Sequence, residues 1–370
     1  MDDSNSSEQH HETGIRSGGS IRSGGSPSRT IRRRTIVKGA AWSLPVLAAA
    51  AAVPMAAAST PACATQKTFF TLPDSPSAAG ITTSFIVPAK VTSLTVIVAG
   101  GAGGSTRADW TILGGNGGLV TATIPVVPGE TLDLVVGQGG ASRLTPYTTN
   151  PSIATGGQGF GKGGDADPAA SNPDGGPGTW WGGAAGGAGS AISRAGQPLV
   201  VAGGGGGAGG IYGYNWYYVS GGRGGDAGKA GEANWSESGG RMDIPGGLVG
   251  GGAAGLGTAT PSNNFFLLPG LATASPRDGA VGGGVSRDYA GSRLGSGAGA
   301  GGGGYAGGGS GARGGTAFAG SSYVVEGAGG AGGTSYLDTA SGVIGTTSTW
   351  KQNTRTTARQ GGTITIEWCA

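Results

Sequence analysis

The sequence predicts an all-β fold in which a scaffold of short strands carries large glycine-rich insertions. Glycine accounts for 86 of the 370 residues, against an average usage of about 7%. Several short runs alternate apolar and polar residues with the period of a half-buried strand, and no segment has the apolar spacing of an amphipathic helix. Glycine fills no core, but it lets two backbones approach closely. The sequence therefore favours closely packed extended segments over a conventional globular interior.

The strand scaffold is predicted at residues 67–140, 197–203 and 362–369. In the first stretch, every second residue is apolar around Leu94 and around Leu134, which is the pattern of a strand with one buried face. The intervening stretches are treated as insertions into this scaffold.

A turn signal lies at residues 127–130, which read Val-Pro-Gly-Glu. Proline and glycine stand at the second and third positions, as a type II turn prefers. We expect this turn to join a strand at 119–127 to one at 131–136 as a hairpin.

A short repeat connects the strands to the glycine. The stretches VIVAGGAGG at 96–104, LVVGQGG at 134–140 and LVVAGGGGG at 199–207 each run from an apolar strand into a glycine string. The repeat predicts that the glycine segments leave the sheet at a common level.

Two insertions, at 141–196 and 203–361, hold most of the glycine. Strict collagen periodicity is absent. Extended three-per-turn glycine helices of the polyglycine II type fit these segments, because their N–H and C=O groups can bond laterally and satisfy a buried backbone. The alternative is disorder, since glycine loses the most entropy on ordering. The repeated junctions and the low charge favour an ordered bundle.

Residues 1–58 have the features of an export leader. A basic stretch containing Arg33, Arg34 and Lys38 precedes an apolar run at 41–58 that ends in three alanines. This arrangement resembles a twin-arginine signal peptide, so the mature exported domain is expected to begin at residue 59. A single membrane anchor is the alternative reading, although two prolines interrupt the run.

The leader also holds much of the positive charge. It contains seven of the 23 Lys and Arg residues and four of the 20 Asp and Glu residues, so the remainder balances at 16 of each. A chain without a basic footprint is not expected to bind nucleic acid. Both histidines, His10 and His11, lie in the leader. Mechanisms that need histidine are therefore excluded for the mature chain, and a non-catalytic protein without a cofactor is expected.

Cys63 and Cys369 stand near the two ends of the mature chain. In an exported protein this placement favours one disulfide, which would stabilise the fold by about 4–5 kcal/mol in chain-entropy models. Two unpaired thiols and a lipid anchor on Cys63 are the alternatives.

An aromatic cluster supplies the candidate ligand-binding residues. They lie close together between glycine strings in the second insertion: Tyr212, Tyr214, Trp216, Tyr217 and Tyr218. Exposed aromatic groups suit recognition of glycans or proteins. The alternative is that they cap a glycine bundle with few other apolar groups. No metal site is expected, and calcium binding through Asp226, or through Asp165 and Asp167, is only a minor possibility.

Six stretches of the chain share one style of strand and glycine string, for example GGNGGLVTATI at 114–124; they are residues 84–88, 94–104, 114–124, 127–140, 199–210 and 361–366. Through these stretches the chain resembles the glycine-rich domain family of anaplastic-lymphoma-kinase-type receptors, in the form of exported bacterial members without a kinase domain. The resemblance implies a jelly-roll, tumour-necrosis-factor-like β-sandwich whose insertions form a polyglycine II helix bundle. It also implies a domain that binds a protein ligand outside the cell.

These observations predict an exported, non-catalytic recognition or adhesion protein at the cell surface or beyond it, with a glycan or protein ligand. A structural protein of the cell envelope or matrix without a specific ligand is the alternative. An ice-binding protein and a two-carboxylate hydrolase are weaker alternatives, because the insertions carry charged and aromatic groups and no rigid acidic pair is evident.

Overall fold

The computed structural model divides the chain into two units, Met1–Pro61 and Ala62–Ala370. It describes residues of the second unit only: 63–72, 80–106, 112–144, 153–166, 178–180, 182–210, 212–214, 217–219, 221–232, 234–236, 242–244, 265–268, 275–282, 297–316, 327–350 and 359–370. The predicted leader, with Arg33, Arg34 and Lys38, lies outside these residues.

The described residues form strands and one short 3₁₀ helix, which confirms the all-β prediction. The elements are β1 (Thr65–Thr71), β2 (Ile81–Ile86), β3 (Ser93–Ala99), β4 (Gly118–Pro125), β5 (Thr131–Val136), β6 (Gly178–Trp180), β7 (Ser190–Arg194), β8 (Gln197–Ala202), β9 (Tyr212–Tyr214), β10 (Tyr217–Val219), β11 (Asn234–Ser236), β12 (Met242–Ile244), β13 (Phe265–Leu268), β14 (Arg313–Thr316), β15 (Tyr336–Leu337), η2 (Thr339–Ser341), β16 (Ile344–Thr349) and β17 (Thr363–Cys369).

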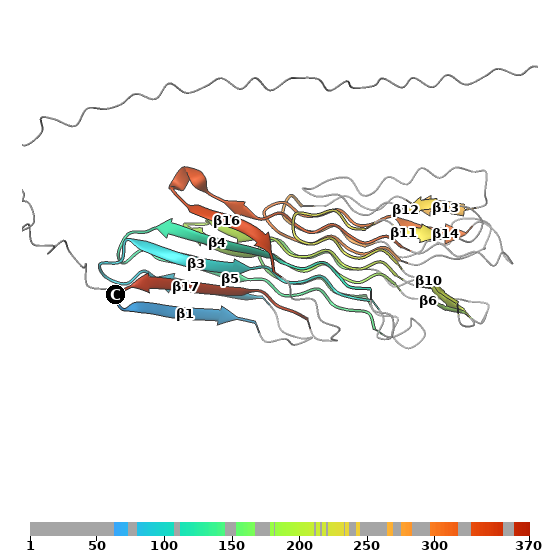
Figure 1. The fold of residues 1–370 in the computed structure, drawn as a ribbon, viewed down its shortest axis with the longest axis horizontal. Coiled ribbons are helices and arrows are strands. Elements are labelled where there is room, and N and C mark those ends of the chain that lie inside the picture. Colours follow the sequence, from blue (N-terminus) through green and yellow to red (C-terminus); the bar gives the residue numbers. More distant parts are fainter. Residues whose placement is uncertain are drawn as a thin grey trace, which may run out of the picture. The chain divides into compact units, whose positions relative to one another are not determined.

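Two five-stranded antiparallel sheets dominate the fold (Figure 1). Sheet A has the strand order β1-β17-β3-β4-β16, and sheet B has the order β15-β8-β7-β5-β2. The first and last of the described strands, β1 and β17, are neighbours in sheet A and pair from Thr65↔Cys369 to Thr71↔Thr363. The chain therefore closes on itself along one edge of this sheet.

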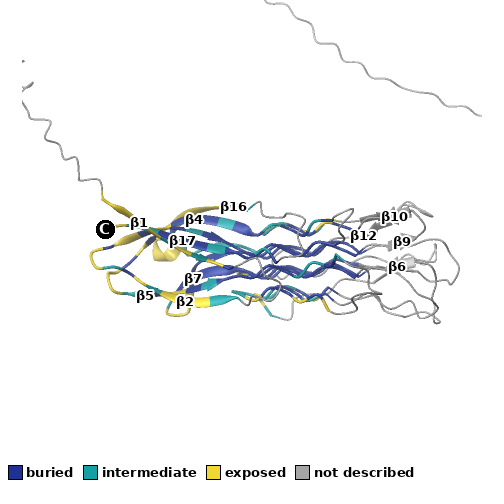
Figure 2. Cartoon of the chain, turned by 90° about the horizontal axis from the view of Figure 1, so that it is seen from below, coloured by how far each residue is buried: buried dark blue, intermediate teal, exposed yellow. Residues whose placement is uncertain are grey.

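The apolar core lies between the two sheets, and its largest side chains come from alternating strand positions. Leu94 and Ile366 in sheet A, and Leu132 and Leu134 in sheet B, are fully buried in one continuous cluster. Successive side chains of a strand point to opposite faces, so the alternation seen in the sequence places one face of each sheet toward the other. Figure 2 shows this burial along the strands. The face-to-face packing fits a β-sandwich.

The turn at residues 127–130 forms, but the hairpin predicted across it is wrong. Gly129 has φ +83°, and the N–H of Glu130 donates to the carbonyl of Val127 at 3.1 Å. However, β4 pairs with β3 and β16 in sheet A, whereas β5 pairs with β2 and β7 in sheet B. A type II turn lacks the twist that a two-residue hairpin needs. It carries the chain from one sheet to the other.

Arg194 ties this crossing to sheet B. Its guanidinium donates from Nη2 to the carbonyl of Pro125 at 2.7 Å and forms a two-pronged contact with the Glu130 carboxylate, both distances being 3.0 Å. Arg194 ends β7, and the turn at Ala195 and Gly196, with φ of +48° and +77°, begins the β7–β8 hairpin. Consecutive positive φ angles match a type I′ turn.

Strands β7, β15 and β16 lie inside the stretches that the sequence indicated as insertions, and were not predicted. β7 (SAISR) has one large apolar residue, and β15 spans two residues. β16 (IGTTST) is an exposed edge strand without alternation, held by its pairing with β4. The edge strands β15 and β16 bury little, so their sequences carry a weak periodic signal. β7 is an inner strand of sheet B and is buried on both faces, so it shows no alternation. The shorter strands β6 and β9–β14 were also not predicted.

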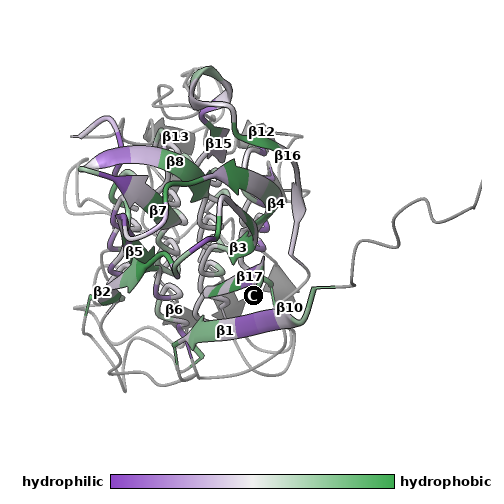
Figure 3. Ribbon diagram, turned by 90° about the vertical axis from the view of Figure 1, so that its left-hand side faces the viewer, coloured by the Kyte–Doolittle hydropathy of each residue, from purple (hydrophilic) through white to green (hydrophobic). Residues whose placement is uncertain are grey.

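Beyond the sheets, the described glycine-rich segments run beside one another; we call them the glycine array. The segments are residues 100–106, 112–117, 137–144, 153–166, 182–189, 203–210, 221–232, 275–282, 297–312 and 327–335. They leave or enter strands such as β3, β5 and β8 at the same end, as the repeated junctions predicted. Figure 3 looks from the sheet end toward these segments. Most of their residues are buried (Figure 2).

Backbone hydrogen bonds hold the array together, and in the segment 203–210 they repeat every three residues. The N–H groups of Gly204, Gly207 and Gly210 donate to carbonyls of segment 297–303. The N–H groups of Gly205 and Ala208 donate to segment 101–104. The N–H groups of Gly206 and Gly209 donate to segment 222–225. The carbonyl groups of 203–208 accept, with the same period, from the segments 327–333, 184–187 and 115–118. One segment thus has six neighbours, and each of its amides has a partner.

Glycine is required where these backbones meet. A Cβ added to Gly207 would overlap the carbonyl oxygen of Ala184, and one added to Gly206 would overlap that of Gly330. Alanine is accommodated at other positions. Small clusters of buried methyl groups form there, for example between Ala184, Ala208 and the side chain of Ile112. The array therefore tolerates a methyl group only in particular gaps between segments.

Cys63 and Cys369 form a disulfide with their Cα atoms 5.2 Å apart. The bond lies at the end of the β1–β17 pair, where the N–H of Ala370 also donates to the carbonyl of Ala64. The sequence left three alternatives for these cysteines: a disulfide, two unpaired thiols and a lipid anchor on Cys63. The structure contains the disulfide. It spans 306 residues of sequence.

Candidate functional site

The predicted aromatic cluster falls on β9 and β10. These strands pair with Tyr214 opposite Tyr217 and Tyr212 opposite Val219. On its other side, β9 pairs with β6, which places Trp180 opposite Tyr212. Trp216 lies outside the described residues. The register thus brings Trp180, from the first insertion, next to the cluster predicted in the second.

The three strands form rows across the small sheet. One row contains Trp180, Tyr212 and Val219, and the row two residues away contains Gly178, Tyr214 and Tyr217. Tyr218 stands in the intermediate row with Gly213 and Thr179. Figure 1 draws β6 and β10 at the end of the glycine array that is remote from sheets A and B.

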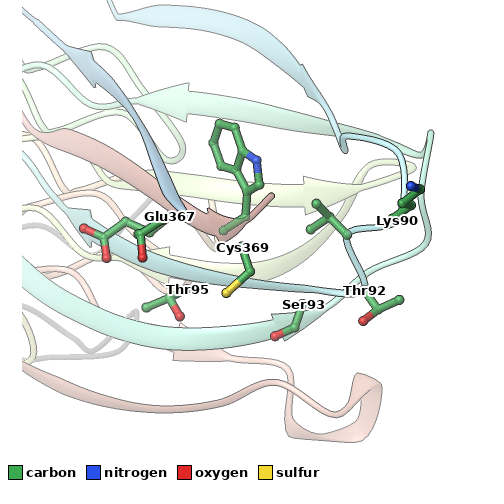
Figure 4. Close-up of a pocket in the computed structure, with 9 residues that line it drawn as sticks. Lys90, Thr92, Ser93, Thr95, Glu367 and Cys369 are labelled. Carbon is green, nitrogen blue, oxygen red and sulfur yellow. The ribbon is translucent and has the colours of Figure 1, made fainter. Parts of the chain in front are cut away.

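A second candidate site is a pocket of about 370 Å³ beside the disulfide. Its lining comes from the start of β1, the turn before β3, the first residues of β3 and the end of β17: Thr65, Lys90, Val91, Thr92, Ser93, Thr95, Glu367, Trp368 and Cys369. Figure 4 shows Glu367 and Lys90 at opposite ends of this group, with Thr95, Cys369 and Ser93 between them. The pocket is therefore lined by four hydroxyl-bearing residues together with Val91, Trp368 and Cys369, and it has a charged group at each end.

The two charged groups differ in their partners. The carboxylate of Glu367 lies 2.6 Å from Nζ of Lys67, so this acid is neutralised by an ion pair. Lys90 is exposed, and within the described part of the chain no salt bridge involves it. The pocket consequently carries one uncompensated positive charge at its Lys90 end.

Lys90 has an unusual backbone conformation. Its φ is +70°, and the N–H of Val91 donates to the carbonyl of Pro88 at 3.2 Å across the turn. The third position of such a turn normally takes glycine or asparagine, and a larger residue there costs about 1–2 kcal/mol. Lys90 therefore places a long basic side chain at a position where glycine would have a lower conformational free energy.

A third group of polar and aromatic residues lies at the edge of sheet B. The rings of Tyr305, from the glycine array, and Tyr336, from β15, stack with centroids 4.0 Å apart and an interplanar angle of 6°. Desolvation, and next the Asp338 carboxylate, raise the pKa of Tyr336 above its ordinary value. The hydroxyl of Ser341 donates to Asp338, and this bond is the main reason that the pKa of Asp338 is lowered. The tyrosine stack joins the array to the edge of sheet B.

The acidic residues that the sequence considered for calcium have other partners. Asp226 accepts from the backbone N–H of Asn116 at 2.8 Å and from its side-chain amide at 3.0 Å. Asp165 accepts from the N–H of Gly156 and lies 2.9 Å from Nζ of Lys162. Asp167 lies outside the described residues. Within the described ranges, no group of three or more metal-binding side chains comes together.

Two buried arginines reach into the array. Arg359, 8% exposed, donates to the carbonyls of Gly139 and Gly156 and to the side chain of Gln138. Burial lowers the pKa of Arg359, and the carboxylate of Asp165 opposes this shift. Arg143 donates to the carbonyl of Gly183 at 3.3 Å. Both guanidinium groups supply donors to carbonyls of the array.

The pocket and the tyrosine stack were not found by sequence reasoning. Lys90 and Glu367 carry no motif, and their proximity depends on the pairing of β1, β17 and β3. A usable signal was the turn at 88–91, where a lysine occupies a position that favours glycine.

Across the described ranges, no helical segment has the length and apolar character needed to cross a bilayer. The disulfide is compatible with an extracellular location. No protein-family model matches the sequence, and no curated protein matches it.

Proposed function

We propose that the protein is an exported, non-catalytic recognition or adhesion protein that uses its glycine array as a rigid support for a binding surface. The observation that carries this proposal is the β6-β9-β10 sheet, which places aromatic residues from two separate insertions in adjacent register positions. Clustered Tyr and Trp residues supply large contact areas at a low entropy cost, and they are enriched where proteins bind ligands.

The proposal includes polyglycine II helices in the array and a jelly-roll, tumour-necrosis-factor-like sandwich in the sheets. The three-residue period of hydrogen bonding and the six neighbours of segment 203–210 support the first part, because extended helices with three residues per turn direct successive amides to different neighbours. Two five-stranded antiparallel sheets with a shared core support the second. The resemblance to the glycine-rich domains of anaplastic-lymphoma-kinase-type receptors belongs to this proposal as well.

Export by the twin-arginine route, with the leader removed after residue 58, is also part of the proposal. It rests on Arg33, Arg34 and Lys38 before the apolar run. The disulfide between Cys63 and Cys369 supports a final location outside the cytoplasm. The cell surface or the medium is where a glycan or protein ligand would be met.

The ligand surface is proposed to comprise Tyr212, Tyr214, Trp216, Tyr217 and Tyr218, now joined by Trp180. Aromatic residues gathered on paired strands suit contact with a sugar ring or an extended protein segment. The alternative function, a structural envelope or matrix protein, is supported by the large share of the array that consists of buried backbone. The two functions differ in whether a saturable ligand exists.

The test is a binding screen of the protein, purified after expression of the full chain, against arrays of glycans and surface proteins. We expect at least one saturable ligand, and we expect replacement of Trp216 and Tyr217 by alanine to weaken it by tenfold or more. Phe69→Ala is the matched control, because Phe69 is an exposed aromatic residue on β1, 62% exposed. The control should bind as well as the unchanged protein.

Two results would contradict the proposal. A screen without any saturable ligand would favour the structural function. Unchanged binding in the Trp216/Tyr217 variant, with normal folding by circular dichroism, would move the ligand surface away from these strands.

A further inference from the structure

We propose that the pocket beside the disulfide binds a saccharide that carries one carboxylate, as uronic acids do. This site differs from the aromatic surface in place and in chemistry, and it does not rest on the function proposed above. It is argued from the lining of the pocket, from its charge and from the conformation of Lys90.

The lining matches a polyhydroxylated ligand. Thr65, Thr92, Ser93 and Thr95 line the pocket and are exposed. Each hydroxyl can donate one hydrogen bond and accept others, as sugar hydroxyls also can. The volume of about 370 Å³ falls within the usual range of small-molecule pockets. Trp368 and Val91 add an apolar part to the lining, and an aromatic group beside hydroxyls suits a sugar ring, which has both apolar and polar parts.

The positive charge of Lys90 favours a sugar that carries a negatively charged group. Glu367 is neutralised by Lys67 at 2.6 Å, so Lys90 supplies the one positive charge that the pocket does not compensate. A single ammonium group matches a single carboxylate, whereas phosphate recognition commonly uses several cations or a bidentate arginine. At the other end of the pocket (Figure 4), the Glu367 carboxylate can still accept hydrogen bonds from sugar hydroxyls.

The backbone conformation of Lys90 supports a ligand-binding role for its side chain. The φ of +70° is one that glycine adopts without steric cost and that lysine adopts with strain. Strained residues concentrate at binding sites, where the strain positions a functional group. The side chain of Lys90 lines the pocket, and a glycine at this position would remove that group.

Position adds a consequence for adhesion. The pocket lies at the disulfide end of sheet A, whereas β6 and β10 lie at the far end of the array (Figure 1). A protein that holds an acidic glycan at one end can present its other end to a second partner.

The test is a titration of the protein with glucuronic acid and, separately, with glucose, followed by ligand-observed NMR. We expect saturable binding of glucuronic acid that weakens as salt is added, because the Lys90 contact is exposed and screened. We expect glucose to bind at least tenfold more weakly. Equal binding of the two sugars, or no binding of glucuronic acid, would overturn the proposal.

Two variants separate the ligand role of Lys90 from a structural one. Lys90→Gln should weaken glucuronic acid binding about tenfold and leave glucose unaffected. Lys90→Gly should lose the same binding while keeping the melting temperature, since glycine adopts this φ freely. Lys229→Gln is the matched control: Lys229 is an exposed lysine in the glycine array, and its loss should change nothing.

The proposal is overturned if Lys90→Gln retains full affinity, or if Lys90→Gly binds as the unchanged protein does. The Trp216/Tyr217 alanine variant should bind glucuronic acid normally. Failure at this pocket and failure at the aromatic surface can therefore be distinguished.

Discussion

Sheets A and B and the glycine array bury their backbones by opposite means. In the sheets, large side chains such as Leu94 and Leu134 fill the space between two layers and exclude water. In the array, many neighbouring segments have nothing larger than a methyl group between them, and the backbone of one segment packs directly against the backbone of another. The sheets are therefore stabilised chiefly by apolar burial, and the array chiefly by hydrogen bonds that leave few amides without a partner.

The comparison teaches that opposite kinds of substitution should be the most damaging in the two regions. Removing side-chain atoms damages the sheets, because it leaves a cavity. Adding side-chain atoms damages the array, because a backbone cannot rotate away as a side chain can.

The largest expected effect is that of Gly207→Val. The added Cβ would overlap the carbonyl oxygen of Ala184, and the segment has neighbours on all sides. We expect the free energy of unfolding to fall by more than about 5 kcal/mol, the range of exceptional substitutions, with loss of amide protection in the array. Chemical denaturation and hydrogen exchange measure this.

Two comparators sharpen this prediction. Ala208→Gly, at the next position, should cost about 1 kcal/mol, because it removes one buried methyl group and adds chain entropy. Leu134→Ala, in the sheets, should cost about 2–5 kcal/mol. If Gly207→Val were as mild as Ala208→Gly, the array would be loosely packed and the contrast between the regions would fail.

The next effect in size is that of replacing both Cys63 and Cys369 by serine. The disulfide spans 306 residues, and chain-entropy models assign such a loop about 4–5 kcal/mol. Because the bond lies at the end of the β1–β17 pair, hydrogen exchange should accelerate first in β1, an edge strand, while the array retains its protection. Earlier loss of protection in the array would contradict this order.

The smallest effect concerns the pH dependence at the edge of sheet B. Hydrogen bonds from Ser341 lower the pKa of Asp338 below its ordinary value of 3.8. The folded form therefore gains stability above that ordinary value and loses it as pH falls through the lowered pKa. Asp338→Asn should remove this part of the acid-induced fall in melting temperature. An unchanged acid limb in the variant would show that Asp338 does not contribute.

The sheets were predictable to the extent that their strands are amphipathic. Alternation identified β3 and β5, whose buried residues form the core. It did not identify β16, which is exposed along most of its length and depends on its pairing with β4. The turn at 127–130 could be recognised from the sequence, but the pairing partners of the strands on either side of it could not. A local sequence specifies a turn type and does not specify which sheet receives the next strand.

The sequence predicted that glycine segments pack against one another, but it did not predict which segments are neighbours. A glycine string looks the same in every phase, so the sequence could not show that Gly204 donates to Gly303 while Gly205 donates to Gly101. The candidate pocket was not predictable either, since the turn that carries Lys90 and the strand that carries Glu367 are placed beside one another by the pairing of β3 with β17. The aromatic cluster was visible in the sequence, and the register adds Trp180 to it.

The threefold repetition of hydrogen bonding in segment 203–210 gives the array a reading frame. Inserting or deleting one residue would redirect every later amide in that segment to a different neighbour, much as a single-nucleotide insertion changes every later codon. A change of three residues would restore the original directions beyond the altered site. Lengths of glycine segments in such a protein are therefore expected to change in multiples of three.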